Sequence, residues 1–351
     1  MRSLTVVLAF VLTLPSVFAE EALTSQNNDR LREGLARYPE ADANKDGILT
    51  LSEATAFLGK MRKPAAAEPS ASARKPDLAN VSYGPHERNV LDFYRAKSDR
   101  PTPVVVFIHG GGFVNGSKDK WADSKMLKQL VEGGVSCAAI NYRFLDTAPI
   151  QDILHDCARA VQFLRSKAGE WNIDKTRVGA TGGSAGAGSS LWLATRDDLA
   201  DPQATDPILR ESSRVCCAAL TATQATYDVT QWESFLGPAK PEFRGSREAT
   251  DYYRLQTAAD LESPAGQAVL KECDMLKWIT KDDAPLFIDN PQDVPAPTNR
   301  GEWLHCTQHA RTVKKQCATC GIECTVVQDE KGARPEMRTF LLQHLGVVTG
   351  K

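Results

Sequence analysis

The chain has 351 residues, of which 42% are hydrophobic and 25% are charged, which is the composition of an ordinary globular protein long enough for one or two domains. Its 42 basic and 44 acidic side chains give a net charge of −2, which argues against a nucleic-acid-binding protein because such a protein needs a basic excess to neutralise phosphate. Beyond the first residues, no apolar run reaches the length of about 18 residues that predicts a membrane span.

The first 19 residues have the pattern of an export signal. Met1 and Arg2 form a short positive region, residues 4–14 are apolar, and residues 17–19 (Val-Phe-Ala) resemble a cleavage site. We therefore predict cleavage after Ala19 and a secreted or periplasmic protein. An oxidising compartment would allow disulfides, and the odd number of nine cysteines leaves at least one thiol without a partner in its own chain.

Residues 42–53 match the twelve-residue loop of an EF-hand at every diagnostic position. Calcium prefers six to eight oxygen ligands, which alternate residues of such a loop supply, and Gly47 permits the sharp turn. The predicted ligands are the side chains of Asp42, Asn44, Asp46, Thr50 and Glu53 and the main-chain carbonyl of Ile48. Apolar residues at helical spacing flank the loop on both sides, so we predict a helical EF-hand module over residues 24–60.

EF-hands generally work in pairs, yet only one such loop is found in this chain. The module is therefore predicted to bind Ca²⁺ and either to pair with another EF-hand or to dock a partner, without a catalytic role. The alternative is a solvated acidic turn that binds no metal. Residues 61–77, rich in Pro, Ala and Ser, predict an extended linker to a second domain over residues 78–351.

From residue 78 onward, strand-like apolar runs alternate with helical ones. Strands are predicted at residues 104–108, 137–141, 178–181, 215–220, 286–289 and 324–328, and a crossover helix is predicted around residues 153–164. This alternation predicts an α/β fold with a mostly parallel sheet and helices on both faces. Aromatic residues gather in residues 222–282, which predicts a cap insertion that covers and shapes the site.

Two motifs follow strands of this sheet, at the edge where α/β sheets bind ligands. Residues 109–113 (His-Gly-Gly-Gly-Phe) follow one strand, and residues 182–186 (Gly-Gly-Ser-Ala-Gly) follow another and open an apolar helix. The second motif has the strand–turn–helix context of a nucleophile elbow, whose glycines leave room for the turn that projects the serine. Singly, the glycine run could be a plain turn and Ser184 a helix N-cap, but together the two motifs indicate a serine hydrolase.

Residues from about 80 to 348 resemble the α/β-hydrolase superfamily, in the branch of esterases similar to hormone-sensitive lipase and bacterial secreted carboxylesterases. Besides the two motifs, the resemblance rests on residues 141–143 (Asn-Tyr-Arg) and 172–177 (Asn-Ile-Asp-Lys-Thr-Arg). It implies that Ser184 is the nucleophile and that the backbone N–H groups of Gly111, Gly112 and Ala185 form the oxyanion hole. Gly183 departs from the resemblance, because many relatives carry an acidic residue there.

The resemblance also implies an acid after the seventh strand and a histidine after the eighth. Asp293 is the predicted acid and Asp289 the second choice, although either could simply cap a loop. No histidine occurs in residues 329–336, where the base is expected. Because the members of a triad need not follow one chain order, we predict His305 as the base, with His309, or no histidine at all, as the alternatives.

The cysteines toward the end of the chain favour a disulfide over zinc, because Cys317-x-x-Cys320 lacks a matching second pair or a nearby histidine. The predicted disulfide lies among Cys273, Cys306, Cys317, Cys320 and Cys324, whereas Cys137, Cys157, Cys216 and Cys217 are predicted to be small buried residues.

The sequence thus predicts a secreted serine carboxylesterase that acts through an acyl-enzyme and needs no cofactor for catalysis. Its substrate would be a small-molecule or polysaccharide ester, with acetyl and feruloyl esters as examples. One alternative is a binding protein with a hydrolase fold that has lost its triad histidine. Another is a calcium-dependent scaffold, in which the EF-hand carries the function and the second domain has no esterase activity.

Overall fold

The computed structural model describes residues 24–26, 28–50, 53–54, 57, 73–240, 243 and 248–347. The chain divides into two compact units, Met1–Glu68 and Pro69–Lys351. The predicted export signal and most of the predicted linker lie outside the described residues. Within the described residues, no helix has the length and apolar character that crossing a membrane requires.

The first unit is a small helical module with its own core. Helix α1 (Asp29–Arg37) starts at Asn28, whose side chain accepts a hydrogen bond from the backbone N–H of Leu31, and a 3₁₀ turn, η1 (Pro39–Ala41), follows it. Helix α1 ends before Pro39 because proline has no backbone N–H to continue its hydrogen bonds. The core consists of Leu31, Ala41, Leu49 and Ala54.

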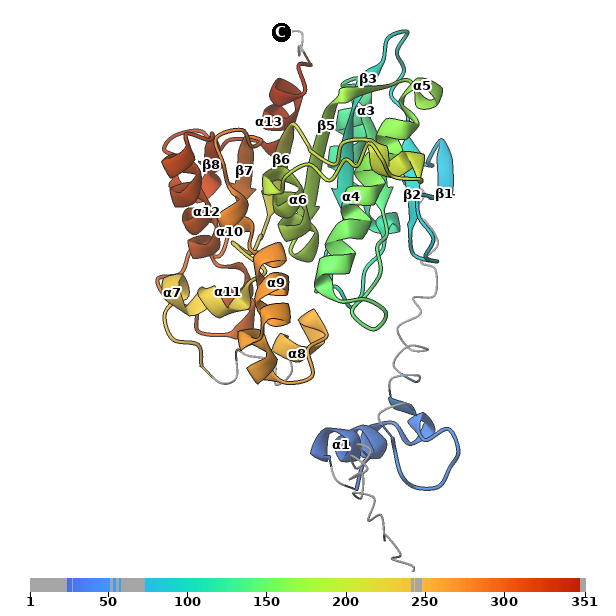
Figure 1. Cartoon of the computed structure of the whole chain (residues 1–351), viewed down its shortest axis with the longest axis vertical. Coiled ribbons are helices and arrows are strands. Elements are labelled where there is room, and N and C mark those ends of the chain that lie inside the picture. Colours follow the sequence, from blue (N-terminus) through green and yellow to red (C-terminus); the bar gives the residue numbers. More distant parts are fainter. Residues whose placement is uncertain are drawn as a thin grey trace, which may run out of the picture. The chain divides into compact units, whose positions relative to one another are not determined.

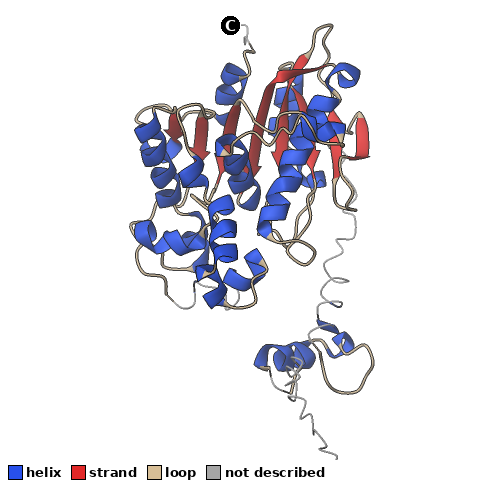
Figure 2. Ribbon diagram, viewed as in Figure 1, coloured by secondary structure: helices blue, strands red, loops and turns tan. Residues whose placement is uncertain are grey.

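The second unit is built on a sheet of eight strands (Figures 1 and 2). The strands are β1 (Leu78–Ser82), β2 (Val90–Tyr94), β3 (Thr102–Ile108), β4 (Ser136–Ile140), β5 (Ile173–Gly183), β6 (Cys217–Thr221), β7 (Leu286–Asp289) and β8 (Cys324–Val326). Their order in the sheet is β1-β2-β4-β3-β5-β6-β7-β8. The β1–β2 and β2–β4 pairs are antiparallel and the others parallel, so the predicted mostly parallel sheet is confirmed.

Helices cover both faces of this sheet, as predicted (Figure 1). They include α3 (Lys125–Glu132), α4 (Ile150–Ser166), α5 (Ala168–Trp171), α6 (Ala185–Thr195), α12 (Thr307–Cys320) and α13 (Met337–His344). Successive side chains of a strand point to opposite faces. In β3, Val104 and Val106 therefore join the core under α4 and α6, while Val105 joins the core under α3 and α13.

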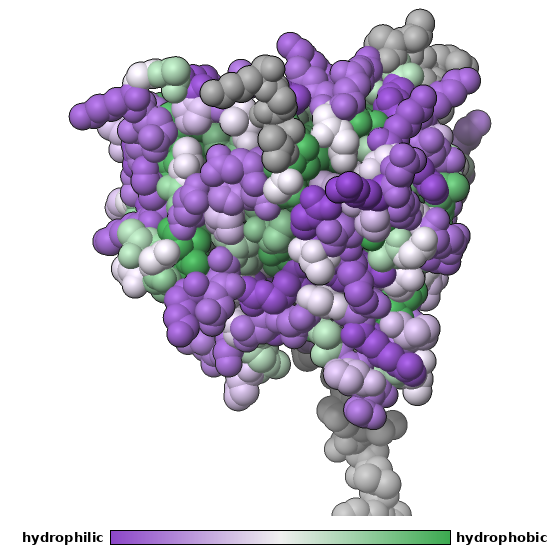
Figure 3. Space-filling view, turned by 90° about the horizontal axis from the view of Figure 1, so that it is seen from above, coloured by the Kyte–Doolittle hydropathy of each residue, from purple (hydrophilic) through white to green (hydrophobic). Residues whose placement is uncertain are grey.

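The segment between β6 and β7 is the predicted cap region. It contains η4 (Val229–Gln231), α7 (Trp232–Leu236), α8 (Glu248–Tyr253), η6 (Ala258–Glu262), α9 (Pro264–Cys273) and α10 (Met275–Trp278). A further short helix, α11 (Arg300–His305), follows β7 and leads into α12. The surface is mostly hydrophilic in the view of Figure 3, and Val114 is the one strongly exposed large hydrophobic residue in the described part of the chain.

All nine cysteines are free thiols, so the predicted disulfide is absent from the structure. Cys273 and Cys306 cannot pair because they are buried in two separate clusters of the core. The side chains of Cys317 and Cys324 lie close enough to act on each other, which lowers the pKa of the Cys317 thiol and raises that of Cys324. Cys137, Cys157 and Cys217 are buried as predicted, whereas Cys216 is only half-buried.

Candidate active site

Ser184 occupies the sharp turn between β5 and α6. Its φ of 51° and ψ of −120° are rare for a residue with a side chain. The turn is held by the backbone N–H of Ser184, which donates to the Thr221 carbonyl of β6 at 2.9 Å. The side chain is thereby presented beyond the carboxyl end of β5, where the sequence places the nucleophile elbow.

The two outer glycines of the elbow motif are required by packing. A Cβ on Gly186 would collide with the carbonyl of Ile108, and a Cβ on Gly182 would lie 2.5 Å from the same carbonyl oxygen. Gly183 differs, because the nearest atom to a Cβ there is the Thr221 carbonyl oxygen at 4.0 Å. The close approach of β5 and α6 to β3 therefore requires glycine at positions 182 and 186, whereas position 183 has room for a Cβ atom.

The glycine loop, residues 109–113 after β3, brings backbone N–H groups close to Ser184. Gly111 and Gly112 have φ values of 123° and 60°, which favour glycine. The N–H groups of Gly112 and Ala185 form no hydrogen bond within the described part of the chain, and both residues line a cavity beside Ser184. Ala185 is the first residue of α6, where helix N–H groups have no intrahelical partner and attract negative charge. Gly111 precedes this pair in the loop and does not line the cavity.

A single arginine ties the glycine loop to the segment after β4. Arg88 donates from Nε to the carbonyl of Tyr142 at 2.7 Å and from its guanidinium to the carbonyl of Gly116 at 3.3 Å. His109 is buried, and burial lowers its pKa to about 4, so its ring is neutral. The ring stacks on Tyr142 at 4.3 Å, and Nδ1–H donates to the Gly110 carbonyl at 2.8 Å. His109 is therefore a structural residue of the loop.

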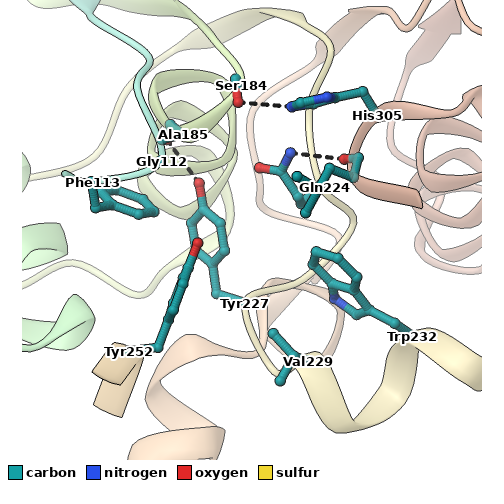
Figure 4. A pocket seen from close by; sticks show the side chains of 11 residues that line it. Gly112, Phe113, Ser184, Ala185, Gln224, Tyr227, Val229, Trp232, Tyr252 and His305 are labelled. Carbon is teal, nitrogen blue, oxygen red and sulfur yellow. Dashed lines mark hydrogen bonds between the residues drawn. The ribbon is translucent and has the colours of Figure 1, made fainter. Parts of the chain in front are cut away.

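Ser184 and His305 are hydrogen-bonded to each other. Ser184 Oγ lies 2.8 Å from His305 Nε2 (Figure 4). On the other side of the ring, Nδ1–H donates to the Gly301 carbonyl, one turn earlier in α11, at 3.2 Å. This bond leaves Nε2 as the acceptor for the serine hydroxyl. Burial lowers the pKa of His305, which favours the neutral ring that a base requires.

The predicted acids are not brought to His305. Asp293 forms a two-pronged ion pair with Arg311, with distances of 2.7 and 3.0 Å, and its side chain is 45% exposed. Asp289 pairs with Arg334 at 2.7 Å. Within the described residues no carboxylate bonds to the His305 ring, so the expected Ser–His–Asp set is corrected to a Ser–His pair whose ring is oriented by a main-chain carbonyl.

His309, the alternative base, has a different position. It is fully buried, and burial lowers its pKa to about 4. Its Nδ1 accepts from the backbone N–H of Ala225 at 3.1 Å, and its Nε2–H donates to the Trp303 carbonyl at 2.9 Å. Both ring nitrogens are thus used to tie α12 to α11 and to the loop after β6, and none is left for Ser184.

The cavity beside Ser184 has a volume of about 40 Å³. Its walls come from the glycine loop, the elbow, the cap region and α11 (Figure 4): Gly112, Phe113, Ser184, Ala185, Gln224, Tyr227, Val229, Trp232, Tyr252, Leu304 and His305. The aromatic residues of the cap were visible in the sequence. Gln224 was not, because a single polar residue after a strand carries no recognisable pattern, and Leu304 could have been found only as the neighbour of His305.

In the EF-hand-like loop, the acidic side chains bond to the loop's own backbone. Asp42 accepts from the N–H of Gly47 at 2.8 Å, Asp46 from the N–H of Ile48 at 2.8 Å, and Glu53 from the hydroxyl of Thr50 at 2.8 Å. Such oxygen donors suit a hard cation. Yet in the described residues no three His, Cys, Asp or Glu side chains gather closely enough to hold a metal ion.

A family model, BD-FAE, matches residues 91–305 of this chain. The match begins in β2, includes both glycine motifs and ends at His305, so it contains every residue of the Ser–His site described above.

Among curated proteins, the chain is 33% identical over 111 residues to the probable isoprenylcysteine alpha-carbonyl methylesterase ICME of Oryza sativa subsp. japonica, a match that covers 31% of this chain and 26% of that protein. It is 30% identical over 164 residues to the esterase LipQ of Mycobacterium tuberculosis, covering 44% and 37% of the two chains. The matched segments thus span well under half of these relatives.

Two solved structures share the fold. A truncated carbohydrate esterase from gut microbiota superposes with a TM-score of 0.60 at 17% identity, covering 79% of this chain and 99% of that one. The propionate-bound esterase 2 of Thermogutta terrifontis gives 0.54 at 19% identity, covering 80% and 97%. Because the family model matches more than half of the chain, the protein belongs to the BD-FAE family of α/β-hydrolase esterases.

Proposed function

We propose that the protein is a serine carboxylesterase, with Ser184 as the nucleophile and His305 as the general base. The observation that supports this most directly is the hydrogen bond of 2.8 Å between Ser184 Oγ and His305 Nε2. It lies next to the backbone N–H groups of Gly112 and Ala185, which have no acceptor among the residues that the structure describes. A serine hydroxyl needs such a base to become a nucleophile.

In the proposed reaction, His305 Nε2 takes the proton of Ser184 while Oγ attacks the ester carbonyl carbon. The negative charge that develops on the carbonyl oxygen is stabilised by the N–H groups of Gly112 and Ala185, with Gly111 as the further predicted donor, by about 3 to 4 kcal/mol per donor. The imidazolium then gives its proton to the departing alkoxide, and an acyl-enzyme remains. Water, deprotonated by His305, attacks the acyl carbon and releases the acid and the free serine.

In this proposal the Gly301 carbonyl does part of what an aspartate does in a triad. It fixes the tautomer that leaves Nε2 as the acceptor, and its partial negative charge faces Nδ1–H of the imidazolium. A carbonyl carries less charge than a carboxylate, so it stabilises the imidazolium less.

We further propose that the natural substrates are esters of carbohydrates, with acetyl and feruloyl esters of polysaccharides as the candidates, and that residues 1–19 direct the protein out of the cytoplasm. The family match and the fold shared with a carbohydrate esterase support the first part, and the pattern of the first residues supports the second. Export is checked by sequencing the N-terminus of the mature protein, which should begin at Glu20.

Hydrolysis of p-nitrophenyl acetate tests the esterase proposal. Replacing the nucleophile or the base (Ser184→Ala or His305→Ala) should lower kcat by about 10³-fold or more, because either change removes the attacking pair. Asp293→Asn is the matched control and should keep kcat within about twofold, since Asp293 bonds to Arg311 instead of His305. Absence of turnover in the unaltered protein would instead indicate a binding protein with a hydrolase fold.

A further inference from the structure

One polar side chain that lines the cavity, that of Gln224, keeps a hydrogen-bond acceptor that no described residue uses. Gln224 lies in the loop after β6, and only 5% of the residue is exposed. Its Nε2–H donates to the carbonyl of Leu304 at 2.9 Å. Its Oε1 accepts no hydrogen bond from the residues that the structure describes, and the atom remains accessible. A buried residue therefore presents a free acceptor to the cavity beside Ser184.

The contact with Leu304 decides which way the amide of Gln224 faces. A carbonyl oxygen can only accept a hydrogen bond, so the NH₂ group of the amide must lie opposite it and Oε1 must point elsewhere. Figure 4 shows the oxygen of the Gln224 amide turned away from this contact and toward the cavity. Turning the amide around would set two oxygens against each other. The direction of the free acceptor is therefore fixed.

The backbone on both sides of Gln224 is held as well. The N–H and the carbonyl of Thr223 bond to the side-chain amide of Asn290, each at 2.9 Å. The N–H of Ala225 donates to the ring of His309 at 3.1 Å. Asn290 and His309 are both fully buried. Gln224 is thus set in place before a substrate arrives, as selective binding requires.

In the proposed reaction, the alcohol part of the ester leaves on the side of Ser184 where His305 lies. The carbonyl oxygen turns to the N–H groups of Gly112 and Ala185, whereas the departing oxygen must come within reach of the histidine that protonates it. Gln224 bonds to α11, the helix that carries His305. Figure 4 shows Gln224 on the same side of Ser184 as His305, with the two residues of the N–H groups on the other side. The free acceptor therefore faces the alcohol part of the ester.

We infer that Oε1 of Gln224 accepts a hydrogen bond from a hydroxyl group on the carbon atom next to the one that bears the ester. The site thereby prefers esters of polyols, such as sugars, to esters of alcohols without a second hydroxyl. A neutral donor fits better than an ammonium group, because none of the described residues that line the cavity carries a carboxylate. The inference rests on the proposed function and names the residue that recognises the alcohol.

Two acetates that differ in one group test this inference: 2-hydroxyethyl acetate and 2-methoxyethyl acetate. They share the acyl group, but only the first can donate a hydrogen bond to Gln224. We expect kcat/KM for the hydroxy ester to be about five- to tenfold higher, which corresponds to one hydrogen bond to a neutral acceptor. A ratio below about threefold would overturn the inference, while hydrolysis of p-nitrophenyl acetate would keep the esterase proposal. If none of the three esters is hydrolysed, the esterase proposal itself fails.

Variants of Gln224 separate recognition of the hydroxyl from the effect of the larger methoxy group. Gln224→Met has a side chain of similar length without the amide oxygen and should bring the ratio of the two kcat/KM values to about one. The ratio cancels any loss that both esters share when the bond to Leu304 is missing. Gln224→Asn keeps the amide but withdraws it by one methylene, and it should lower the ratio in the same direction.

Gln308→Met is the matched control. Gln308 lies on α12, is half-buried and does not line the cavity, so this variant should keep the ratio of the unaltered protein. A ratio that survives both Gln224→Met and Gln224→Asn would refute the recognition of the hydroxyl, even where both esters lose activity by the same factor. Gln224 would then serve only to hold α11.

Discussion

His305 is the residue whose environment bears most directly on the proposed reaction. Its pKa is lowered by burial, and the Gly301 carbonyl opposes this shift only in part. A carboxylate in the same place would raise the pKa, as an opposite charge favours the protonated ring. The pH dependence of turnover therefore reports which group faces Nδ1.

We expect kcat/KM for p-nitrophenyl acetate to rise with pH as His305 loses its proton, with a midpoint below about pH 6.5, the ordinary pKa of histidine. The rate constant rises with pH because only the neutral ring can accept the serine proton. The lowered pKa extends the pH range in which the ring is neutral toward weakly acidic solution. A pH profile under conditions where the protein stays folded checks this. A midpoint above about pH 7 would show that a carboxylate faces the ring after all.

Arg88 is a positioning residue for the amides of the glycine loop. Besides its bonds to Tyr142 and Gly116, its guanidinium lies 3.7 Å from the ring centroid of Phe144. We expect Arg88→Ala to lower kcat about tenfold with KM within about twofold, because the amides act on charge that develops in the transition state. Arg88→Lys should fail to restore kcat, since an ammonium group cannot donate to both carbonyls and stack on the ring.

The control for this prediction is Arg100→Ala, which removes an exposed arginine of the same unit and should leave both constants unchanged. Equal losses of activity in Arg88→Ala and Arg100→Ala, or full rescue by lysine, would contradict the positioning role.

The sequence could predict single site residues only where a motif or a neighbour marks them. Ser184 stands in a motif with a defined turn, and His305 was selected because residues 329–336 contain no histidine. The place of Asp293 after a strand predicts it as the acid, yet it pairs with Arg311, eighteen residues further along the chain. Such a pairing depends on how α12 packs beside the loop, which no local pattern records.

At the scale of elements, the elbow joins β5 to α6 and brings both against β3. Gly186→Ala should destabilise the protein by about 3 kcal/mol or more, because its Cβ would collide with the carbonyl of Ile108 in a backbone that cannot move aside. Gly183→Ala is the matched change in the same motif and should cost less than about 1 kcal/mol, since no atom lies closer than 4.0 Å to its Cβ.

Urea denaturation of the two variants measures this difference. Similar free energies of unfolding for Gly186→Ala and Gly183→Ala would contradict the packing explanation of the motif.

The interior strands were predictable because they are buried on both faces and read as continuous apolar runs. The run at residues 104–108 became β3, and residues 286–289 became β7 with the same limits. The antiparallel strands β1, at the edge of the sheet, and β2, next to it, are missing from the sequence-based prediction. In β1 only Leu78 and Val81, three residues apart, are partly buried, so the sequence Leu-Ala-Asn-Val-Ser lacks the alternation that predicts a strand.

At the scale of the whole molecule, the two units are expected to act independently of each other. All residues proposed for catalysis belong to the second unit, and the proposed calcium ligands belong to the first. We expect isothermal titration of the full chain with CaCl₂ to show one site with a Kd of about 10⁻⁴ to 10⁻³ M, which is typical of extracellular EF-hands. Saturating calcium should leave kcat/KM for p-nitrophenyl acetate unchanged.

Glu53→Gln should abolish this binding, because the last residue of the loop is predicted to supply both carboxylate oxygens. Glu40→Gln, an exposed residue just outside the loop, is the control and should bind as before. Binding that survives Glu53→Gln, or no heat of binding in the unaltered chain, would leave the loop as a turn held by its own hydrogen bonds.

With His305, which precedes β8, as the proposed base, the chain after β8 needs no catalytic residue. Residues 329–334, between β8 and α13, are exposed and contribute nothing to the cavity. In a hydrolase that keeps its histidine there, any graft would disturb the base. Here the same stretch, apart from Asp329 and Arg334, which pair with Arg311 and Asp289, offers an attachment point for a dye, a surface or a second catalytic module.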